Sequence, residues 1–166
     1  MTGGPAGVVT VRAARPADAE AIGGIMREFA AYLRSLGDEG PLQGGADMVR
    51  RYGFGSGAAF TALVAEQDGA LLGYLLYHFG FDADRACRIV HVIDLYVREH
   101  ARRHGVARAL MERARGICRD AGGGGLVWSV YKPNGLAADF YDRLGARRID
   151  DLDFMWWEAA NPHPPR

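Results

Sequence analysis

The sequence predicts a mixed α/β fold with a largely antiparallel central sheet, helices on both faces of the sheet and one parallel strand pair. Short segments with a two-residue apolar period alternate with longer segments whose apolar residues recur every three or four positions. An Asp-Gly pair joins two of the short segments, as in an antiparallel hairpin. A helical segment later separates two apolar strands, and such a crossover makes the two strands parallel.

The N-terminal part is expected to form an edge strand and two helices. A short strand over Val8–Arg12 precedes a helix that begins near Pro16, because proline fits the first helical turn and Asp18 complements the helix dipole. An apolar stripe predicts the buried face of this helix: Ile22, Ile25, Met26, Phe29, Ala30 and Leu33. A loop over Ser35–Gly45 leads to a second short helix over Asp47–Tyr52.

The middle of the chain is expected to form an antiparallel meander. Strands are predicted over Ala59–Glu66 and Ala70–Phe79, joined by the turn Gln67-Asp68-Gly69. A polar loop after Gly80 leads to a third strand over Cys87–Val97.

The remaining elements alternate between helix and strand. They are a helix over Val106–Ala121, a strand over Leu126–Tyr131, a helix over Asn134–Leu144 with Gly145 as its C-terminal cap, and closing strands over Arg147–Ile149 and Asp153–Glu158. Trp156 and Trp157 alternate in the last strand, so one is expected in the core and the other at an edge or a dimer surface.

Length and composition indicate one domain over residues 8–160, with a disordered lead-in at 1–7 and a flexible tail at 161–166. The 20 basic and 20 acidic side chains balance, which argues against nucleic acid or an anionic membrane as partner. Cys87 and Cys118 have neither disulfide-framework nor metal-ligand spacing, so no metal is expected. The sequence shows neither a signal peptide nor an apolar run long enough to cross a bilayer, so a cytoplasmic protein is expected.

A basic, glycine-containing turn links the strand that ends at Val97 to the next helix. The first N–H groups of a helix lack intrahelical acceptors, and the helix dipole favours an anion beside them. Gly105 removes the Cβ that would obstruct such an anion, and Ala107 is small. The turn Arg102–Ala107 is therefore predicted to bind a phosphate, and most simply a diphosphate.

Arg102-x-x-Gly105-x-Ala107 after a strand resembles the acyl-CoA pyrophosphate signature of the GNAT superfamily of N-acetyltransferases. The segments VTVRAARPADAEAI, IDLYV and NGLAADFYDRLGARR match the family in order and spacing over nearly the whole chain. The resemblance is closest to the spermidine/spermine and thialysine acetyltransferase branch. It implies a GNAT-like acyl-CoA N-acyltransferase fold with a splayed parallel strand pair, a homodimer, and direct acetyl transfer from acetyl-CoA to the primary amine of a small molecule.

The resemblance implies a set of residues that would hold acetyl-CoA. Main-chain groups of Leu95, Tyr96 and Val97 would pair with the pantetheine and supply the oxyanion donor. The further residues of this set are Arg102, Arg103, His104, Gly105, Val106, Ala107, Arg108, Asn134 and Ala137. For Arg102, a direct phosphate contact and a charge beside the helix both remain open, and Asn134 fits either a cofactor contact or a helix cap.

Tyr141 corresponds to the tyrosine that acts as general acid in the resembled branch. Asn134 and Tyr141 lie seven residues apart, about two helical turns, and so share a face. A phenol with a pKa near ~10 is protonated at neutral pH and can donate to a departing thiolate. Phe140 and Tyr141 could instead both be core aromatics.

The general base is not evident, because Ile93 stands where the branch has a glutamate and Tyr32-Leu33 stands where it has a Tyr-Glu pair. A polyamine acceptor is therefore not expected. His91 lies on the same strand face as Ile93 and is one candidate base. Asp94 is the other, although it points to the opposite face unless a bulge turns it. Deprotonation through water also remains open.

Acceptor recognition is expected to involve Tyr32, the loop Ser35–Glu39 and the hairpin acids Asp82 and Asp84. A CoA-binding domain without catalysis and a protein or peptide N-terminal acetyltransferase are the competing functions. A nucleotide-binding Rossmann domain is disfavoured, because no GxGxxG follows the first strand.

Overall fold

A five-stranded sheet in the order β1-β2-β3-β4-β5 forms the centre of the computed structural model, which describes residues 7–41, 43–157 and 159. The strands are β1 (Thr10–Ala13), β2 (Thr61–Gln67), β3 (Ala70–Asp82), β4 (Cys87–Val97) and β5 (Gly125–Val127). Strands β1 to β4 pair antiparallel in sequence order, and β5 pairs parallel with β4. The predicted fold class is therefore confirmed.

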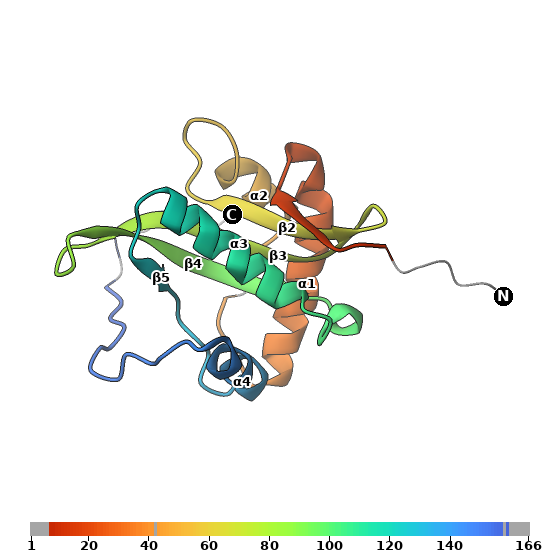
Figure 1. Ribbon diagram of the computed structural model, residues 1–166. Coiled ribbons are helices and arrows are strands. Elements are labelled where there is room, and N and C mark those ends of the chain that lie inside the picture. The colour runs from red at the N-terminus through yellow and green to blue at the C-terminus, as the bar shows by residue number, and fades with distance from the viewer. Residues whose placement is uncertain (1–6, 42, 158, 160–166) are drawn as a thin grey trace.

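Helices cover both faces of this sheet (Figure 1). They are α1 (Ala19–Ser35), α2 (Ala46–Tyr52), α3 (Val106–Asp120) and α4 (Gly135–Leu144), with 3-10 turns η1 (Pro16–Asp18) and η2 (Glu99–Ala101). Helices α1 and α2 cover one face and α3 covers the other, while α4 lies beside the C-terminal end of α1. No helix in the described part of the chain is long and apolar enough to span a membrane.

Two apolar clusters hold the helices on the sheet. The cluster under α3 joins Val106, Leu110 and Ala114 to strand residues such as Leu75 and Val92. The cluster under α1 and α2 is formed by alternating residues of the same strands and by most of the predicted α1 stripe: Ile22, Ile25, Met26, Val64, Tyr74, Leu76 and Tyr96. Within each regular stretch of strand, alternation thus places neighbouring residues under opposite helix layers.

The hairpin between β2 and β3 forms as predicted. Asp68 and Gly69 have φ values of 51° and 80°, and these two left-handed residues make the tight turn that an Asp-Gly pair favours. Strand β3 continues to Asp82 rather than Phe79, because β4 pairs with it along that extension.

Three expectations for the C-terminal part are wrong. Strand β5 ends at Val127 instead of Tyr131, because its pairing with β4 stops there. Residues 147–157 contain no strand, and Glu158 lies outside the described residues. Trp156 and Trp157 are both exposed, at 88% and 97%. An extended segment forms a strand only where a neighbouring strand pairs with its backbone hydrogen-bonding groups, and the described residues supply no such neighbour here.

Candidate active site

A cavity opens where β4 and β5 separate. The parallel pairing runs from Ile89–Gly125 to His91–Val127 and ends there. Beyond this point the two segments enclose a cavity of ≈ 210 Å³ with α1 and α4. Its lining residues are Phe29, Leu33, Val92, Ile93, Asp94, Leu95, Trp128, Ser129, Val130, Tyr131, Asn134, Ala137 and Tyr141.

A β-bulge in β4 determines which side chains reach this cavity. Leu76 pairs with Asp94 and Tyr77 pairs with Val92, so Ile93 is an extra residue on β4. One extra residue reverses the alternation of the strand after it. Val92 therefore packs under α3, whereas Asp94 pairs with Leu76 on the α1 face, the same face as His91. Asp94 is expected to face the site only if a bulge turns it, and this bulge does so.

The Asp94 carboxylate accepts a hydrogen bond from Tyr74, with 2.5 Å between Tyr74 Oη and Asp94 Oδ2. Burial raises the pKa of Asp94 to about 6, although the hydrogen bonds from Tyr74 and the Leu95 N–H act in the opposite direction. Burial also raises the pKa of Tyr74 well above 10, so Tyr74 stays a donor. Asp94 can thus exchange a proton close to neutral pH.

Tyr141 lines the same cavity as Asp94, from helix α4. Its ring packs against Trp128 and Phe140, with centroid distances of 4.9 and 5.1 Å. Burial raises the pKa of Tyr141 to about 12, and the charge of Asp94 adds to this effect. The phenol is therefore protonated at neutral pH, as a general acid requires.

His91 forms a pair with His78 on β3. His78 Nε2 and His91 Nδ1 are 3.0 Å apart, and the imidazole rings meet edge to face. Burial lowers the pKa of His91, and the neighbouring His78 lowers it further. His91 does not line the cavity that Asp94 and Tyr141 share. Of the two candidate bases, Asp94 is the one that lines the cavity together with the predicted acid.

The turn before α3 has the backbone of an anion site. Arg103 and Gly105 have φ values of 64° and 81°, and in the described residues no side chain caps the N-terminus of α3 at Val106. A Cβ placed on Gly105 would meet no atom within 4 Å. The first N–H groups of α3 therefore have no side-chain acceptor, and the space beside Gly105 is open.

The arginines around this turn lie in different surroundings. The Arg102 guanidinium lies over the Tyr32 and Tyr96 rings, and Arg102 Nε donates to Val97 O at 3.0 Å. Arg108 donates to the carbonyl of Arg143 near the end of α4. Arg103 and His104 are exposed, while Val106 is buried and Ala107 partly buried in the α3 layer. Arg103 and His104 are thus the basic side chains of the turn that are exposed beside Gly105.

Asn134 caps α4 and lines the cavity. Its Oδ1 accepts hydrogen bonds from the Ala137 N–H at 3.1 Å and from Tyr32 Oη at 2.9 Å. Asn134, Ala137 and Tyr141 all line the cavity, as the two-turn spacing of the first and last predicts. Asn134 therefore has the predicted cap role, and its contact with a cofactor stays a prediction.

The edge of β4 facing the cavity is not covered by another strand of the described residues past His91, although its Leu95 N–H bonds to the Asp94 carboxylate and its Val97 O accepts from Arg102. The Arg98 N–H donates to Leu72 O on β3, so strand alternation directs the Tyr96 groups to β3 and those of Leu95 and Val97 to the opposite edge. Past His91, no strand in the described residues pairs with this edge. The Leu95 C=O and the Val97 N–H are thus placed to pair with an extended ligand.

Sequence reasoning missed Tyr74, His78 and Trp128. Tyr74 and His78 contact the candidate bases only because β3 and β4 pair in one particular register, which no local pattern fixes. Trp128 lies in a segment predicted as a continuous strand, and its contact with Tyr141 requires β5 to end before it.

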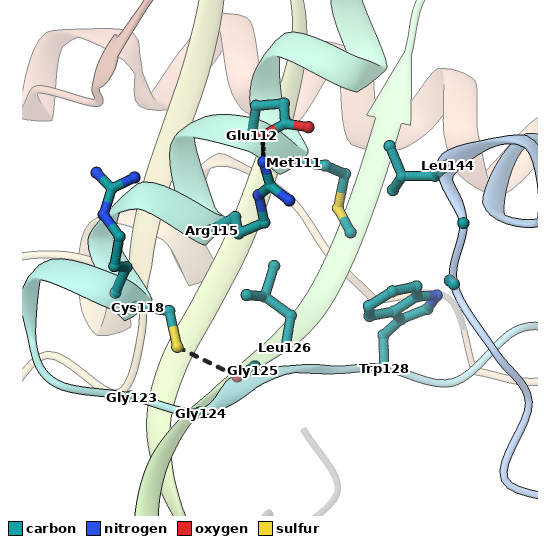
Figure 2. A pocket seen from close by; sticks show the side chains of 13 residues that line it. Met111, Glu112, Arg115, Cys118, Gly123, Gly124, Gly125, Leu126, Trp128 and Leu144 are labelled. Carbon is teal, nitrogen blue, oxygen red and sulfur yellow. Dashed lines mark hydrogen bonds and ion pairs between the residues drawn. The ribbon is translucent and has the colours of Figure 1, made fainter.

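A second cavity of ≈ 360 Å³ lies between α3, β5 and the end of α4 (Figure 2). Figure 2 shows Met111, Leu126, Trp128 and Leu144 around it. Trp128 is the one lining residue that it shares with the cavity of Asp94 and Tyr141. This larger cavity contains none of the predicted site residues, so it is separate from the candidate active site.

Comparisons with known proteins agree with this geometry. A thialysine N-epsilon-acetyltransferase from Sus scrofa is 29% identical over 153 residues, covering 87% of this chain and 88% of the relative. Among solved structures, an integron cassette protein from V. cholerae has a TM-score of 0.77 at 22% identity, covering 91% and 93% of the two chains. A ribosomal-protein-alanine N-acetyltransferase from Brucella melitensis biovar Abortus 2308 has a TM-score of 0.71 at 17% identity, covering 90% and 100%.

The two structural neighbours share the fold at low sequence identity, and so they support the architecture alone. The model of the acetyltransferase (GNAT) family matches residues 29–146, from the middle of α1 to the residue after the cap of α4. That range includes the β4 bulge, the turn before α3 and the cavity. The chain therefore belongs to the acetyltransferase (GNAT) family.

Proposed function

We propose that this protein transfers an acetyl group from acetyl-CoA to the primary amine of a small, amino-acid-like molecule, by direct attack in a ternary complex. The observation that carries the proposal is the meeting of a carboxyl group and a phenol, Asp94 and Tyr141, in one cavity beside the open edge of β4. The similarity to a thialysine N-epsilon-acetyltransferase supports an amine on a small molecule. The cavity volume of ≈ 210 Å³ is consistent with such an acceptor.

The main chain would hold acetyl-CoA at two places. N–H groups at the start of α3 would bind the diphosphate, with Arg103 adding charge and His104 a further hydrogen-bond donor. The open edge at Leu95 and Val97 would pair with the pantetheine. Together these contacts would place the thioester at the mouth of the cavity.

The side chains would then move two protons. Asp94, directly or through water, would accept a proton from the acceptor ammonium, and the neutral amine would attack the thioester carbonyl. On the open edge of β4 the Val97 N–H would stabilise the tetrahedral oxyanion. As the C–S bond breaks, Tyr141 would protonate the thiolate, giving the amide and free CoA. His91, held by His78, would serve at most as a relay outside the cavity.

We further propose a cytoplasmic homodimer. Cys87 and Cys118 are free thiols, which suits a reducing compartment. The segment after α4 exposes several large apolar side chains: Ile149, Leu152, Phe154, Met155, Trp156 and Trp157. Contiguous exposed apolar groups mark interaction surfaces, and Trp, Phe and Met are enriched at the core of interfaces. A second copy of the chain would cover them.

Replacing Gly105 by alanine is expected to weaken acetyl-CoA binding by at least about tenfold, because a methyl group would enter the space where the diphosphate would bind. Isothermal titration calorimetry measures the dissociation constant. Gly122→Ala at the other end of α3 is the matched control, since Gly122 also has positive φ and open surroundings. Equal affinities in the two variants would contradict a phosphate site at this turn.

Tyr141→Phe is expected to lower kcat by about 10² to 10⁴-fold without weakening acetyl-CoA binding, because only the proton donor is removed. Release of CoA thiol across a panel of small amines, in steady state, provides the measurement. Full turnover in Tyr141→Phe would remove this residue from the acid role, and absence of thiol release from the wild-type protein with every amine would favour a CoA-binding domain without catalysis.

The value of kcat/KM is expected to rise with pH through about pH 6, where Asp94 ionises, and then to reach a plateau. Asp94→Asn should lose this rise along with most of the activity.

The stability of the folded protein should change with pH in the opposite sense. Because folding raises the pKa of Asp94, its contribution is complete below about pH 4 and is lost as the pH rises through about 6. Asp94→Asn should therefore unfold at a higher temperature than wild type at pH 8, measured calorimetrically, and an unchanged pH limb in the variant would exclude Asp94 as the base.

Light scattering after size exclusion is expected to give twice the 18.0 kDa chain mass, and replacing Trp156 and Trp157 together by serine should shift the protein to the monomer mass. Phe81→Ser is the control, because Phe81 is also an exposed aromatic residue but lies on β3. A monomeric wild type, or a dimer that the tryptophan variant leaves intact, would show that this segment is not the interface.

A further inference from the structure

Helix α4 carries Tyr141 but has little packing of its own. None of its residues is fully buried, although Phe140, Tyr141 and Leu144 contact the α3 cluster from outside. The helix lies beside the C-terminal end of α1, away from the centre of the sheet (Figure 1). A helix with a thin apolar contact needs polar contacts to fix its position, because propensity alone does not hold ten residues helical.

The strongest such contact is at the start of α4. Asn134 is buried, with 8% exposure. Its Oδ1 accepts from both the Ala137 N–H and Tyr32 Oη, so one oxygen joins the α4 cap to α1. A buried amide oxygen with two donors has a fixed orientation, and losing one donor leaves part of its hydrogen-bonding capacity unmet.

Tyr32 is itself held by the turn before α3. The Arg102 guanidinium carbon lies 4.9 Å from the Tyr32 ring centroid and 5.1 Å from that of Tyr96. Arg102 Nε also donates to Val97 O at 3.0 Å, which ties the arginine to the end of β4. The planar cation therefore lies against two aromatic rings while its position is set by the strand.

We propose that Tyr32 is a positioning residue that acts through Asn134, and that Arg102 holds Tyr32 in place for this task. The contacts run from Arg102 in the turn to Tyr32 on α1, and on to Asn134 at the start of α4. Two helical turns further along the same helix lies Tyr141. The inference deepens the proposed function and rests on it for the role of Tyr141.

This contact chain predicts a specific kinetic signature. Tyr32→Phe keeps the ring that packs against Arg102 and removes only the hydroxyl that reaches Asn134. The start of α4 then has one hydrogen bond fewer to α1, so Tyr141 spends less time in the productive position. We expect kcat to fall about 2- to 12-fold, the factor that corresponds to one neutral hydrogen bond, while KM for acetyl-CoA stays within about twofold.

The experiment compares Tyr32→Phe with Tyr52→Phe, a control on α2 that loses the hydroxyl of another partly buried tyrosine in the same layer. Hydrogen–deuterium exchange of residues 135–144 in the unliganded protein reads out the position of α4 without requiring activity. Exchange should increase several-fold in Tyr32→Phe and stay at the wild-type level in Tyr52→Phe. Arg102→Gln should loosen α4 in the same way.

A double-mutant cycle tests whether Tyr32 acts through Asn134. In an Asn134→Ala background the further change Tyr32→Phe should have no added effect on exchange or on kcat, because the shared contact is already lost. Additive effects would overturn the inference, and so would wild-type exchange of α4 in Tyr32→Phe. Failure of the wild-type protein to acetylate any amine would instead reject the proposed function, and the exchange cycle would still decide whether this contact chain positions α4.

Discussion

The one extra residue at Ile93 is the constraint on which the site depends. Without it, strict alternation along β4 would place Asp94 on the α3 face, among apolar side chains that offer the carboxylate no partner. With it, Asp94 reaches Tyr74 on the α1 face and lies beside the cavity that β4 and β5 open. A bulge in the middle of a sheet disrupts the ladder of hydrogen bonds between two strands. This bulge lies next to the point where the β4–β5 pairing ends, so it turns Asp94 toward the cavity that opens there.

Burial acts on both members of the proposed acid–base pair and gives them complementary properties. It raises the pKa of Asp94 to about 6, which makes this carboxyl group basic enough to take a proton at neutral pH. It raises the pKa of Tyr141 to about 12, which keeps that phenol protonated under the same conditions. One physical cause thus prepares a base and an acid in one cavity. A zero net charge over the whole chain is no obstacle, because these effects are local.

Sequence patterns predict the features that local periodicity controls, and they fail for features that depend on how strands pair. Asp68-Gly69 makes its hairpin and α1 buries most of its apolar stripe, because turn chemistry and helical period are local properties. The contact between Tyr74 and Asp94 depends on the register of β3 against β4, which no short pattern contains. The closing strands fail for a related reason, since the apolar run Phe154–Trp157 has no neighbouring strand in the described residues.

Arg102 shows why a motif does not transfer a role to each of its residues. A phosphate site made of backbone N–H groups needs a turn whose N–H directions are fixed, and side-chain charge is secondary to that. The Nε–H of Arg102 is used on Val97 O and its guanidinium lies on Tyr32 and Tyr96, so this arginine fixes the turn to β4 and α1. Arg103 and His104, which are exposed beside Gly105, are the ones free to approach an anion. The arginine that fixes the turn and the basic side chains free to reach an anion are therefore different residues, although they are adjacent in one basic run of the sequence.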